Sequence, residues 1–135
     1  MSSARRPLLV LVGPPSSGKT TVGTALAGRL GIAFRDTDAD VEAGTGQRVA
    51  DLFIDLGEPH FRALEERAVA VALEEHDGIL ALGGGAVLSA VTRERTRRSR
   101  ALRRGWLWIE PHTASTSPLP QPQVRWKRGT ELPSP

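Results

Sequence analysis

A glycine-rich segment near the N-terminus carries the residue types that hold a phosphate chain. It reads GPPSSGKTT, Gly13–Thr21, and follows the short apolar run Pro7–Val12. The segment fits G-x-x-x-x-G-K-[ST], in which the glycines let backbone N–H groups curl around an anion. An apparent strand before it and an apparent helix after it are the context that this motif requires. We therefore predict a nucleoside triphosphate site here rather than a glycine-rich turn that fits by chance.

Two side chains of this loop have a predicted chemical role. Lys19 should reach the β- and γ-phosphates as a catalytic residue, and Thr20 should ligate Mg²⁺ through its hydroxyl. The helix that starts near Gly18 adds its positive end. The predicted nucleotide contacts are Gly13, Pro14, Ser16, Ser17, Gly18, Lys19, Thr20 and Thr21.

A pair of carboxylates ends the second short apolar segment, Ile32–Asp36. Asp36 and Asp38 are two residues apart, so strand periodicity sends both side chains to the same side. The carboxyl end of a parallel strand is where α/β folds bind ligands. One carboxylate could hold Mg²⁺ through water while the other orients or deprotonates an acceptor hydroxyl. Alternatively, Asp38 could only cap the helix that follows.

Two more groups have both a plain structural interpretation and a functional one. Arg62 and Glu65 are three residues apart on a predicted helix, which is typical of an exposed ion pair. In the functional interpretation, Glu65 holds Arg62 in place to grip an acceptor carboxylate. Gly83–Gly85 could form a flexible loop, or their backbone could approach a ligand and offer N–H donors. The three histidines share no ligand spacing, so we assign them no metal.

The elements that must position these groups alternate between short apolar runs and amphipathic segments. The predicted strands are Pro7–Val12, Ile32–Asp36 and Ile79–Leu82, and the predicted helices are Lys19 to a stop at Gly31, Asp38–Glu42 with a break at Gly44–Gly46, Val49–Leu56 and Glu58–Glu75. The side chains expected to mark their inner faces are Val22, Leu26, Leu30, Val49, Leu52, Phe53, Leu56, Phe61, Leu64, Ala68, Val71 and Ala72. This alternation predicts an α/β fold, a P-loop NTPase-type parallel sheet with helices on both faces.

Length and composition limit the classes of protein that this chain can be. Its 135 residues suffice for one domain with a modest core, and 39% apolar with 24% charged residues is ordinary for a globular protein. No cysteine is present, so disulfides and thiolate metal sites are excluded. The apolar run near the N-terminus is too short for a membrane span or a signal-peptide core. We expect a cytoplasmic protein without a membrane partner.

The composition changes near Arg93. Residues 1–93 carry 9 basic and 12 acidic side chains, whereas residues 94–135 carry 9 basic and 3 acidic ones. Such a basic stretch could bind polyanions weakly. A charge run is usually only solvated, however, and we do not expect nucleic acid as a partner.

The C-terminal part gives a weak structural signal. The arginine-rich stretch after Arg93 could be a basic helix, and Trp106–Glu110 could be one more strand. Beyond Pro111 the sequence is rich in proline, serine and arginine and shows no clear period, which predicts irregular coil or disorder. We therefore predict a kinase domain over residues 1–110, a tail over residues 111–135, and a fold whose C-terminal portion is incomplete or irregular.

The order and spacing of four segments resemble the shikimate kinase family over about residues 7–90. These segments are GPPSSGKTT, FRDTDADVE, FRALEE and LALGGGAVL. The resemblance implies transfer of the γ-phosphoryl group of ATP to the 3-hydroxyl of shikimate, with Mg²⁺, in the pathway to the aromatic amino acids. It implies that Asp36 contacts the metal through water and that Asp38 holds the shikimate hydroxyls and assists deprotonation of the attacking one. It also implies that Arg62 pairs with the shikimate carboxylate, that the amides of Gly83, Gly84 and Gly85 help to seat the ring, and that the protein is a monomer.

The resemblance ends with G-G-G-A. The family continues with a lid that carries an arginine, and no RPLL-like segment is found here. We therefore hypothesise a frameshifted or truncated member of the family with weak or no kinase activity and marginal stability. The alternatives are another small-molecule P-loop kinase of the gluconate kinase type, which the D-T-D and G-G-G-A elements disfavour, and a non-catalytic nucleotide-binding fragment.

Overall fold

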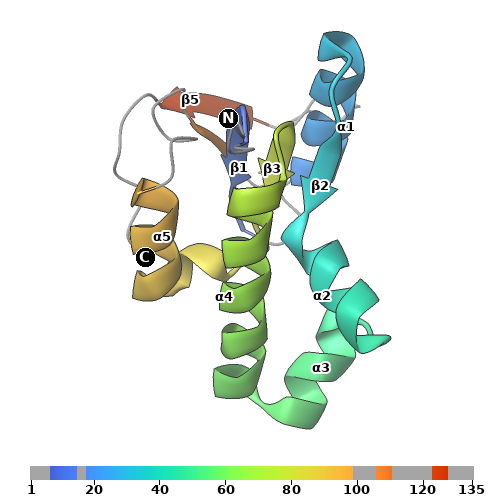
Figure 1. Ribbon diagram of the computed structural model, residues 1–135, viewed down its shortest axis with the longest axis vertical. Coiled ribbons are helices and arrows are strands. Elements are labelled where there is room, and N and C mark those ends of the chain that lie inside the picture. Colours follow the sequence, from blue (N-terminus) through green and yellow to red (C-terminus); the bar gives the residue numbers. More distant parts are fainter. Residues whose placement is uncertain (1–6, 15–17, 99–105, 111–122, 128–135) are drawn as a thin grey trace, which may run out of the picture.

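The computed structural model describes residues 7–14, 18–98, 106–110 and 123–127, the last two ranges as backbone only. Figure 1 shows short strands beside the long helix α4, with α2 and α3 next to the lower half of that helix. The elements are β1 (Leu9–Val12), α1 (Lys19–Leu30), β2 (Phe34–Asp36), α2 (Thr37–Thr45), α3 (Val49–Leu56), α4 (Glu58–Glu75), β3 (Ile79–Ala81), the 3₁₀ turn η1 (Ala86–Leu88), α5 (Ala90–Arg98), β4 (Trp106–Glu110) and β5 (Gln123–Lys127). Within the described residues, no helix is long and apolar enough to cross a bilayer.

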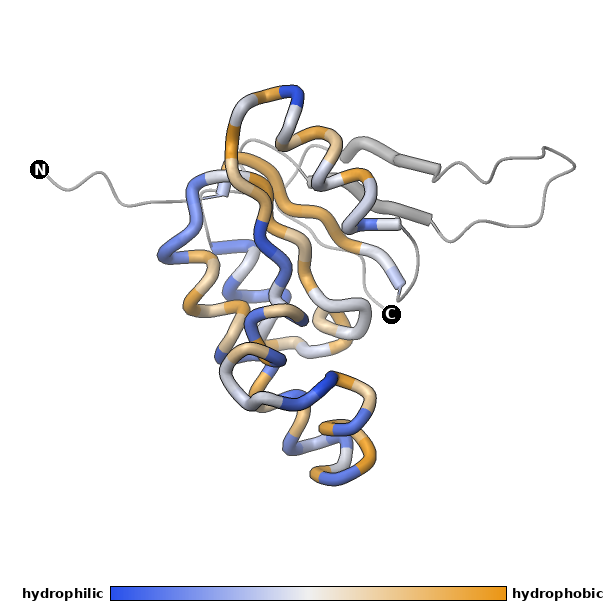
Figure 2. Tube along the Cα trace, turned by 90° about the vertical axis from the view of Figure 1, so that its right-hand side faces the viewer, coloured by the Kyte–Doolittle hydropathy of each residue, from blue (hydrophilic) through white to orange (hydrophobic). Residues whose placement is uncertain are grey.

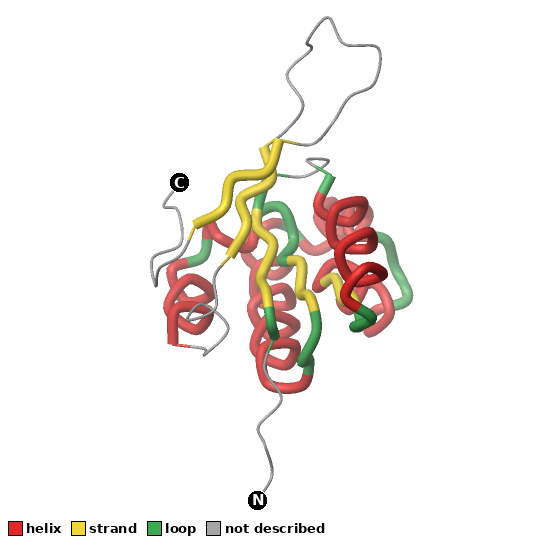
Figure 3. Tube along the Cα trace, turned by 90° about the horizontal axis from the view of Figure 1, so that it is seen from above, coloured by secondary structure: helices red, strands yellow, loops and turns green. Residues whose placement is uncertain are grey.

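The strands form one sheet in the order β2-β3-β1-β4-β5 (Figure 3). The first four strands of this order pair in parallel, with Leu9 and Phe34 both opposite Ile79, and Val10 opposite Trp106. The predicted parallel α/β sheet is therefore confirmed, and the segment Trp106–Glu110 is a strand as expected.

One expectation for the C-terminal part is wrong. Residues 123–127, within the stretch predicted to be irregular, form β5 and pair antiparallel with β4. The sequence QVRWK alternates polar residues with a β-branched and an aromatic residue, which is the pattern of a strand. The surrounding stretch is rich in proline and serine, which obscures this short strand pattern in the sequence. The other predicted tail residues, 111–122 and 128–135, lie outside the described part of the chain.

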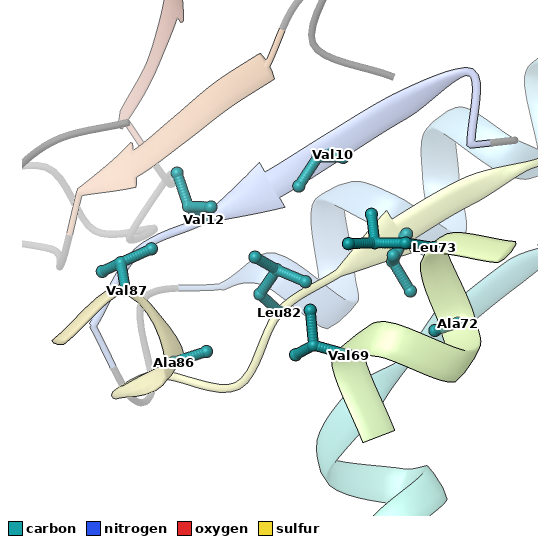
Figure 4. Close-up of a cluster of buried hydrophobic side chains, with 9 residues drawn as sticks. Val10, Val12, Val69, Ala72, Leu73, Leu82, Ala86 and Val87 are labelled. Atoms are coloured by element: carbon teal, nitrogen blue, oxygen red, sulfur yellow. The ribbon is translucent and has the colours of Figure 1, made fainter. Parts of the chain in front are cut away.

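The central strands are buried on both faces. The side chains of β1 alternate, so that Val10 and Val12 pack with α4, whereas Leu9 and Leu11 pack with α1. Figure 4 shows the α4 side of this core, and Figure 2 shows the strands as the most continuously hydrophobic part of the tube. Side chains buried on both faces explain why the strands have continuous apolar runs. The prediction of helices on both faces of the sheet is confirmed.

Four predicted inward side chains are exposed instead. Leu30 of α1 is 54% exposed, Phe53 and Leu56 of α3 are 39% and 41% exposed, and Val71 of α4 is 40% exposed. On α1 the buried positions are Gly23 and Ala27, so the inner face is rotated by one residue from the one predicted. On α4 the predicted Phe61 and Ala72 are buried, together with Glu65, Val69 and Leu73, so the packed face includes Val69 and Leu73 in place of Val71.

The helices end close to the glycines that were predicted to stop them. Helices α3 and α4 have the predicted bounds, and α1 ends at Gly31 as predicted. Helix α2 is longer than predicted, since it begins at Thr37 and continues through Gly44 to Thr45, with Gly46 as its C-cap. The helical hydrogen bonds therefore tolerate the first of the two glycines.

Candidate active site

The described residues of the glycine-rich loop, Gly13, Pro14 and Gly18, lie between β1 and the side chain of Lys19 at the start of α1. Gly18 precedes the helix in a left-handed conformation with φ of 99°. Lys19 is buried, and its Nζ donates hydrogen bonds to the carbonyl oxygens of Gly13 at 2.7 Å and Pro14 at 2.8 Å. Burial lowers the pKa of Lys19, and the nearby carboxylates of the β2 end oppose that shift. The predicted strand and helix are thus in place on either side of the loop, with Lys19 at the point where the positive end of α1 begins.

Not every predicted nucleotide contact can be placed. Ser16 and Ser17 lie outside the described residues. Thr20 and Thr21 are exposed in the first turn of α1. Exposure is what residues that contact a ligand at the mouth of the loop require.

Thr20 and Asp36 come together from α1 and the end of β2. The Thr20 hydroxyl lies 3.4 Å from Oδ2 of Asp36. A hydroxyl and a carboxylate, completed by phosphate oxygens and water, form the hard oxygen donor set that Mg²⁺ prefers. Among the described residues no cluster of three histidine, aspartate or glutamate side chains could hold a metal by itself. The two residues therefore fit a metal shared with a phosphate ligand rather than an all-protein metal site.

Asp36 and Asp38 lie in different elements of secondary structure. Strand β2 ends at Asp36, which is the N-cap of α2 and accepts the N–H of Asp38 at 2.9 Å. Asp38 is already in the helix, so the strand-periodicity argument for the pair is wrong. The capping interpretation proposed for Asp38 applies instead to Asp36. The two carboxylates still share one region, because both act electrostatically on Lys19.

Asp38 is half-buried among like charges. Burial, together with the charges of Asp36 and Glu65, raises the pKa of Asp38 to about 6, and Lys19 opposes this shift. A carboxylate with a pKa near 6 accepts a proton at neutral pH more readily than an ordinary one. Strongly shifted carboxylates are typical of functional sites.

Arg62 and Glu65 do not form the exposed ion pair of the plain interpretation. Nη1 of Arg62 donates to Oε1 of Glu65 at 2.8 Å, and Glu65 is only 2% exposed. The guanidinium also lies 5.9 Å from the ring centre of Phe53 and 5.6 Å from that of Phe61. Burial raises the pKa of Glu65, and Arg62 opposes that shift. This packing fixes Arg62 in one orientation, as the recognition of a carboxylate requires.

The triple glycine follows β3 and lies against these charged side chains. A Cβ on Gly83 would be 2.3 Å from Oδ1 of Asp38, and one on Gly85 would be 2.3 Å from Nη1 of Arg62. Glycine is therefore needed at both positions because side chains of the site touch the backbone. The half-buried Gly84 lies between them.

The amide of Gly83 has a different partner from the one expected. Its N–H donates to the hydroxyl of Thr37 at 2.9 Å, so this amide is occupied within the fold. The contribution of Gly83 to the site is the space that it leaves for Asp38. Sequence reasoning missed Thr37, although its position within D-T-D between the two carboxylates was a signal. It also missed Phe53 and Phe61, which it treated as core.

The predicted site residues that the structure describes lie near one another on four elements and the glycine loop. Lys19, Thr20 and Asp36 lie at one end, Asp38 is in the middle, and Gly83 and Gly85 with Arg62 are at the other. Placement of the cation and of the carboxylate in separate regions would have refuted the sequence interpretation. The arrangement has a phosphate-binding loop, an acidic side chain suited to accept a proton, and a half-buried arginine suited to bind an anion.

Comparisons with known proteins agree with this geometry. The family model described as shikimate kinase matches residues 15–114. The chain is 64% identical over 87 residues to the shikimate kinase of Saccharopolyspora erythraea, a match that covers 64% of this chain and 50% of the relative. The shikimate kinase of Salinispora arenicola is also 64% identical over 87 residues, covering 64% of this chain and 52% of the relative. The chain spans about half the length of the curated relatives it matches.

Solved structures show the same likeness. Shikimate kinase from Acinetobacter baumannii in complex with shikimate matches with a TM-score of 0.67 and 33% identity, covering 82% of this chain and 57% of that one. Shikimate kinase from Bacteroides thetaiotaomicron matches with a TM-score of 0.65 and 32% identity, covering 70% and 53%. Since the family model covers more than half of the 135 residues, the chain belongs to the shikimate kinase family.

Proposed function

We propose that this chain binds ATP and shikimate side by side and transfers the γ-phosphoryl group to the 3-hydroxyl of shikimate. The observation that carries the proposal is the placement of Asp38 between Lys19 and the Arg62–Glu65 pair. A phosphoryl donor on the loop and a carboxylated acceptor at Arg62 would then meet at Asp38. The relative from Acinetobacter baumannii, which was solved with shikimate, supports the choice of acceptor.

The nucleotide half of the proposed site consists of the loop and the first turn of α1. Lys19 would exchange its two loop carbonyls for phosphate oxygens, and its buried position keeps water away from that contact. Thr20 and Asp36 would hold Mg²⁺, which neutralises charge on the phosphates. The loop amides would bind the phosphates without side-chain obstruction.

The acceptor half uses the charges around the glycine loop. Arg62 would bind the shikimate carboxylate through its guanidinium, while the buried Glu65 keeps that group in place. Asp38 would accept the proton of the 3-hydroxyl as the oxygen attacks the γ-phosphorus. The bond between the γ-phosphorus and the bridging oxygen then breaks, and ADP leaves with the electron pair. The absence of side chains at Gly83 and Gly85 leaves room for Asp38 and Arg62 beside the backbone, where the ring would bind.

Calorimetry on the whole chain tests this proposal directly. A non-hydrolysable ATP analogue with Mg²⁺ and shikimate should each bind when titrated separately. The Lys19→Met variant should lose only the nucleotide, and Arg62→Leu should lose only shikimate. Nucleotide binding without shikimate binding in the wild-type chain would refute the acceptor half, and the reverse would refute the nucleotide half.

A coupled assay for ADP release tests the transfer itself. Shikimate should support turnover and gluconate should not, because gluconate is the acceptor of the alternative kinase type considered above. The same assay tests the prediction from the sequence that turnover is weak. A chain that phosphorylates gluconate in preference to shikimate would overturn the proposed substrate.

We also infer a monomer located in the cytoplasm. The family resemblance implies a single-chain enzyme, and the absence of cysteine fits a reducing compartment. Light scattering behind size-exclusion chromatography should give the mass of one chain, 14.5 kDa. A stable dimer mass at micromolar protein would contradict the monomer.

A further inference from the structure

We propose that Thr37 is a positioning residue of the acceptor site, whose hydroxyl holds the backbone of Gly83 so that the Asp38 carboxylate stays free for substrate. Thr37 touches neither proposed substrate in this assignment. The inference rests on the proposed function, since it concerns how the acceptor side of that site is kept in shape.

The hydrogen bond between these residues joins two distant parts of the chain. Thr37 is the first residue of α2 and is completely buried, and its Oγ1 accepts the N–H of Gly83 at 2.9 Å. The two residues are 46 positions apart. They lie just beyond the end of the parallel pairing of β2 with β3, where Asp36 is opposite Ala81. The side chain of Thr37 therefore extends the sheet ladder by one bond into the site.

The other side of Gly83 faces two carboxylates. A Cβ at this residue would be 2.3 Å from Oδ1 of Asp38 and 2.8 Å from Oε2 of Glu65. An N–H that donates to a carboxylate makes a stronger bond than one that donates to a neutral hydroxyl. Without the Thr37 hydroxyl, the amide of Gly83 would thus turn toward a carboxylate, with Asp38 nearest.

Asp38 needs its oxygens for the acceptor hydroxyls. Within the described residues its carboxylate accepts no hydrogen bond, and the groups that act on it do so through charge alone. The hydrogen bond between Thr37 and Gly83 keeps the Asp38 carboxylate free of the Gly83 amide. It also holds the glycine loop at contact distance from Asp38. A shift of about 1 Å in such a contact can cost on the order of 100-fold in rate.

Two substitutions at Thr37 separate the hydroxyl from the shape of the side chain. Thr37→Val keeps the branched shape and removes the acceptor, whereas Thr37→Ser keeps the acceptor and removes a methyl group. Thr92→Val is the matched control, because Thr92 is also completely buried but its Oγ1 has no partner among the described residues. Each variant is the whole chain, titrated by calorimetry with shikimate and with a non-hydrolysable ATP analogue. Hydrogen exchange at the Gly83 amide is followed by NMR.

The expected pattern is specific to the acceptor side. Thr37→Val should weaken shikimate binding about tenfold or more, the change expected from one lost buried hydrogen bond, and should leave ATP-analogue binding within twofold. Its Gly83 amide should exchange about tenfold faster than in the wild-type chain. Thr37→Ser should restore both values, and Thr92→Val should change neither ligand. A merely structural role would weaken both ligands together.

Several results would overturn the inference. If the wild-type chain binds shikimate and Thr37→Val binds it equally well, the role of Thr37 is refuted and the proposed function stands. Equal loss in Thr37→Ser and Thr37→Val would show that the hydroxyl is not responsible. A wild-type chain that binds no shikimate would refute the proposed function and this inference with it. If Thr37→Val fails to fold, the test uses the exchange rate of the Gly83 amide in the wild-type chain and in Thr37→Ser. A Gly83 amide that exchanges as fast as an exposed loop amide in the wild-type chain would refute the hydrogen bond to Thr37.

Discussion

Replacing Asp38 by asparagine should stabilise the folded chain at neutral pH and abolish the proposed proton transfer. The side chain of Asp38 is half-buried, and the carboxylates of Asp36, Glu65 and Glu42 raise its pKa, whereas among the described residues Lys19 opposes them. Ionised Asp38 is therefore more costly in the folded chain than in the unfolded one. An uncharged amide of nearly the same shape removes this cost.

The size of the effect follows from the pKa. Burial and neighbouring charges raise the pKa of Asp38 from its usual 3.8 to about 6. A raised pKa of an acid means that the folded chain holds its proton longer, so stability is lost as the pH rises from about 4 to about 6. The full difference corresponds to about 3 kcal/mol at pH 7.5. Because Asp38 is not fully buried, solvent screening reduces the expected gain of Asp38→Asn to about 1–2 kcal/mol.

The assay is urea unfolding of the wild-type chain and of Asp38→Asn at several pH values. The gain in the free energy of unfolding should be largest at pH 7.5 and should shrink as the pH falls toward 4.5, because the wild-type carboxyl is then protonated in the folded state. Asp77→Asn is the control, since Asp77 is exposed and forms no ion pair among the described residues. A gain that is independent of pH, or a loss at pH 7.5, would refute the electrostatic reasoning.

Two further substitutions have expected outcomes. Gly85→Ala should displace the Arg62 guanidinium, which lies 2.3 Å from the added Cβ, and lower shikimate affinity about tenfold in calorimetry, since the bond to the buried Glu65 is lost. Gly28→Ala, where a Cβ meets nothing within 4 Å, should leave that affinity unchanged, and equal effects of the two would contradict the contact. Thr92→Val should raise the free energy of unfolding by about 1 kcal/mol in urea, because it removes a buried hydroxyl without a partner; a marked loss would show that this hydroxyl has one.

Much of the fold could be predicted because its signals are local. The apolar run before the glycine-rich loop indicated a strand buried on both faces, and glycines at the helix ends marked where α1, α3 and α4 stop. The order of the four motifs also identified the family that the comparisons show. Side-chain burial on the helices was harder to predict, because Val71 and Leu30 fit an apolar period but lie one row away from the packed face.

The details of the site depended on contacts between distant segments. Spacing suggested a strand geometry for Asp36 and Asp38, but the helix starts between them and gives the cap to the first. The pair Arg62–Glu65 has the same spacing whether it is exposed or buried, and tertiary packing buried Glu65 and placed Arg62 between aromatic rings and the glycine loop.

By itself, the sequence determined the phosphate-binding loop, the order of strands and helices, and the identity of the charged groups, because these depend on residues close together in the chain. The tertiary structure alone decided the raised pKa of Asp38 and the partner of the Gly83 amide. Both arise where β2 ends beside β3 and residues 46 positions apart come within a hydrogen bond. Desolvation and charge at that point depend on which side chains pack there, and a local sequence pattern does not determine which side chains those are.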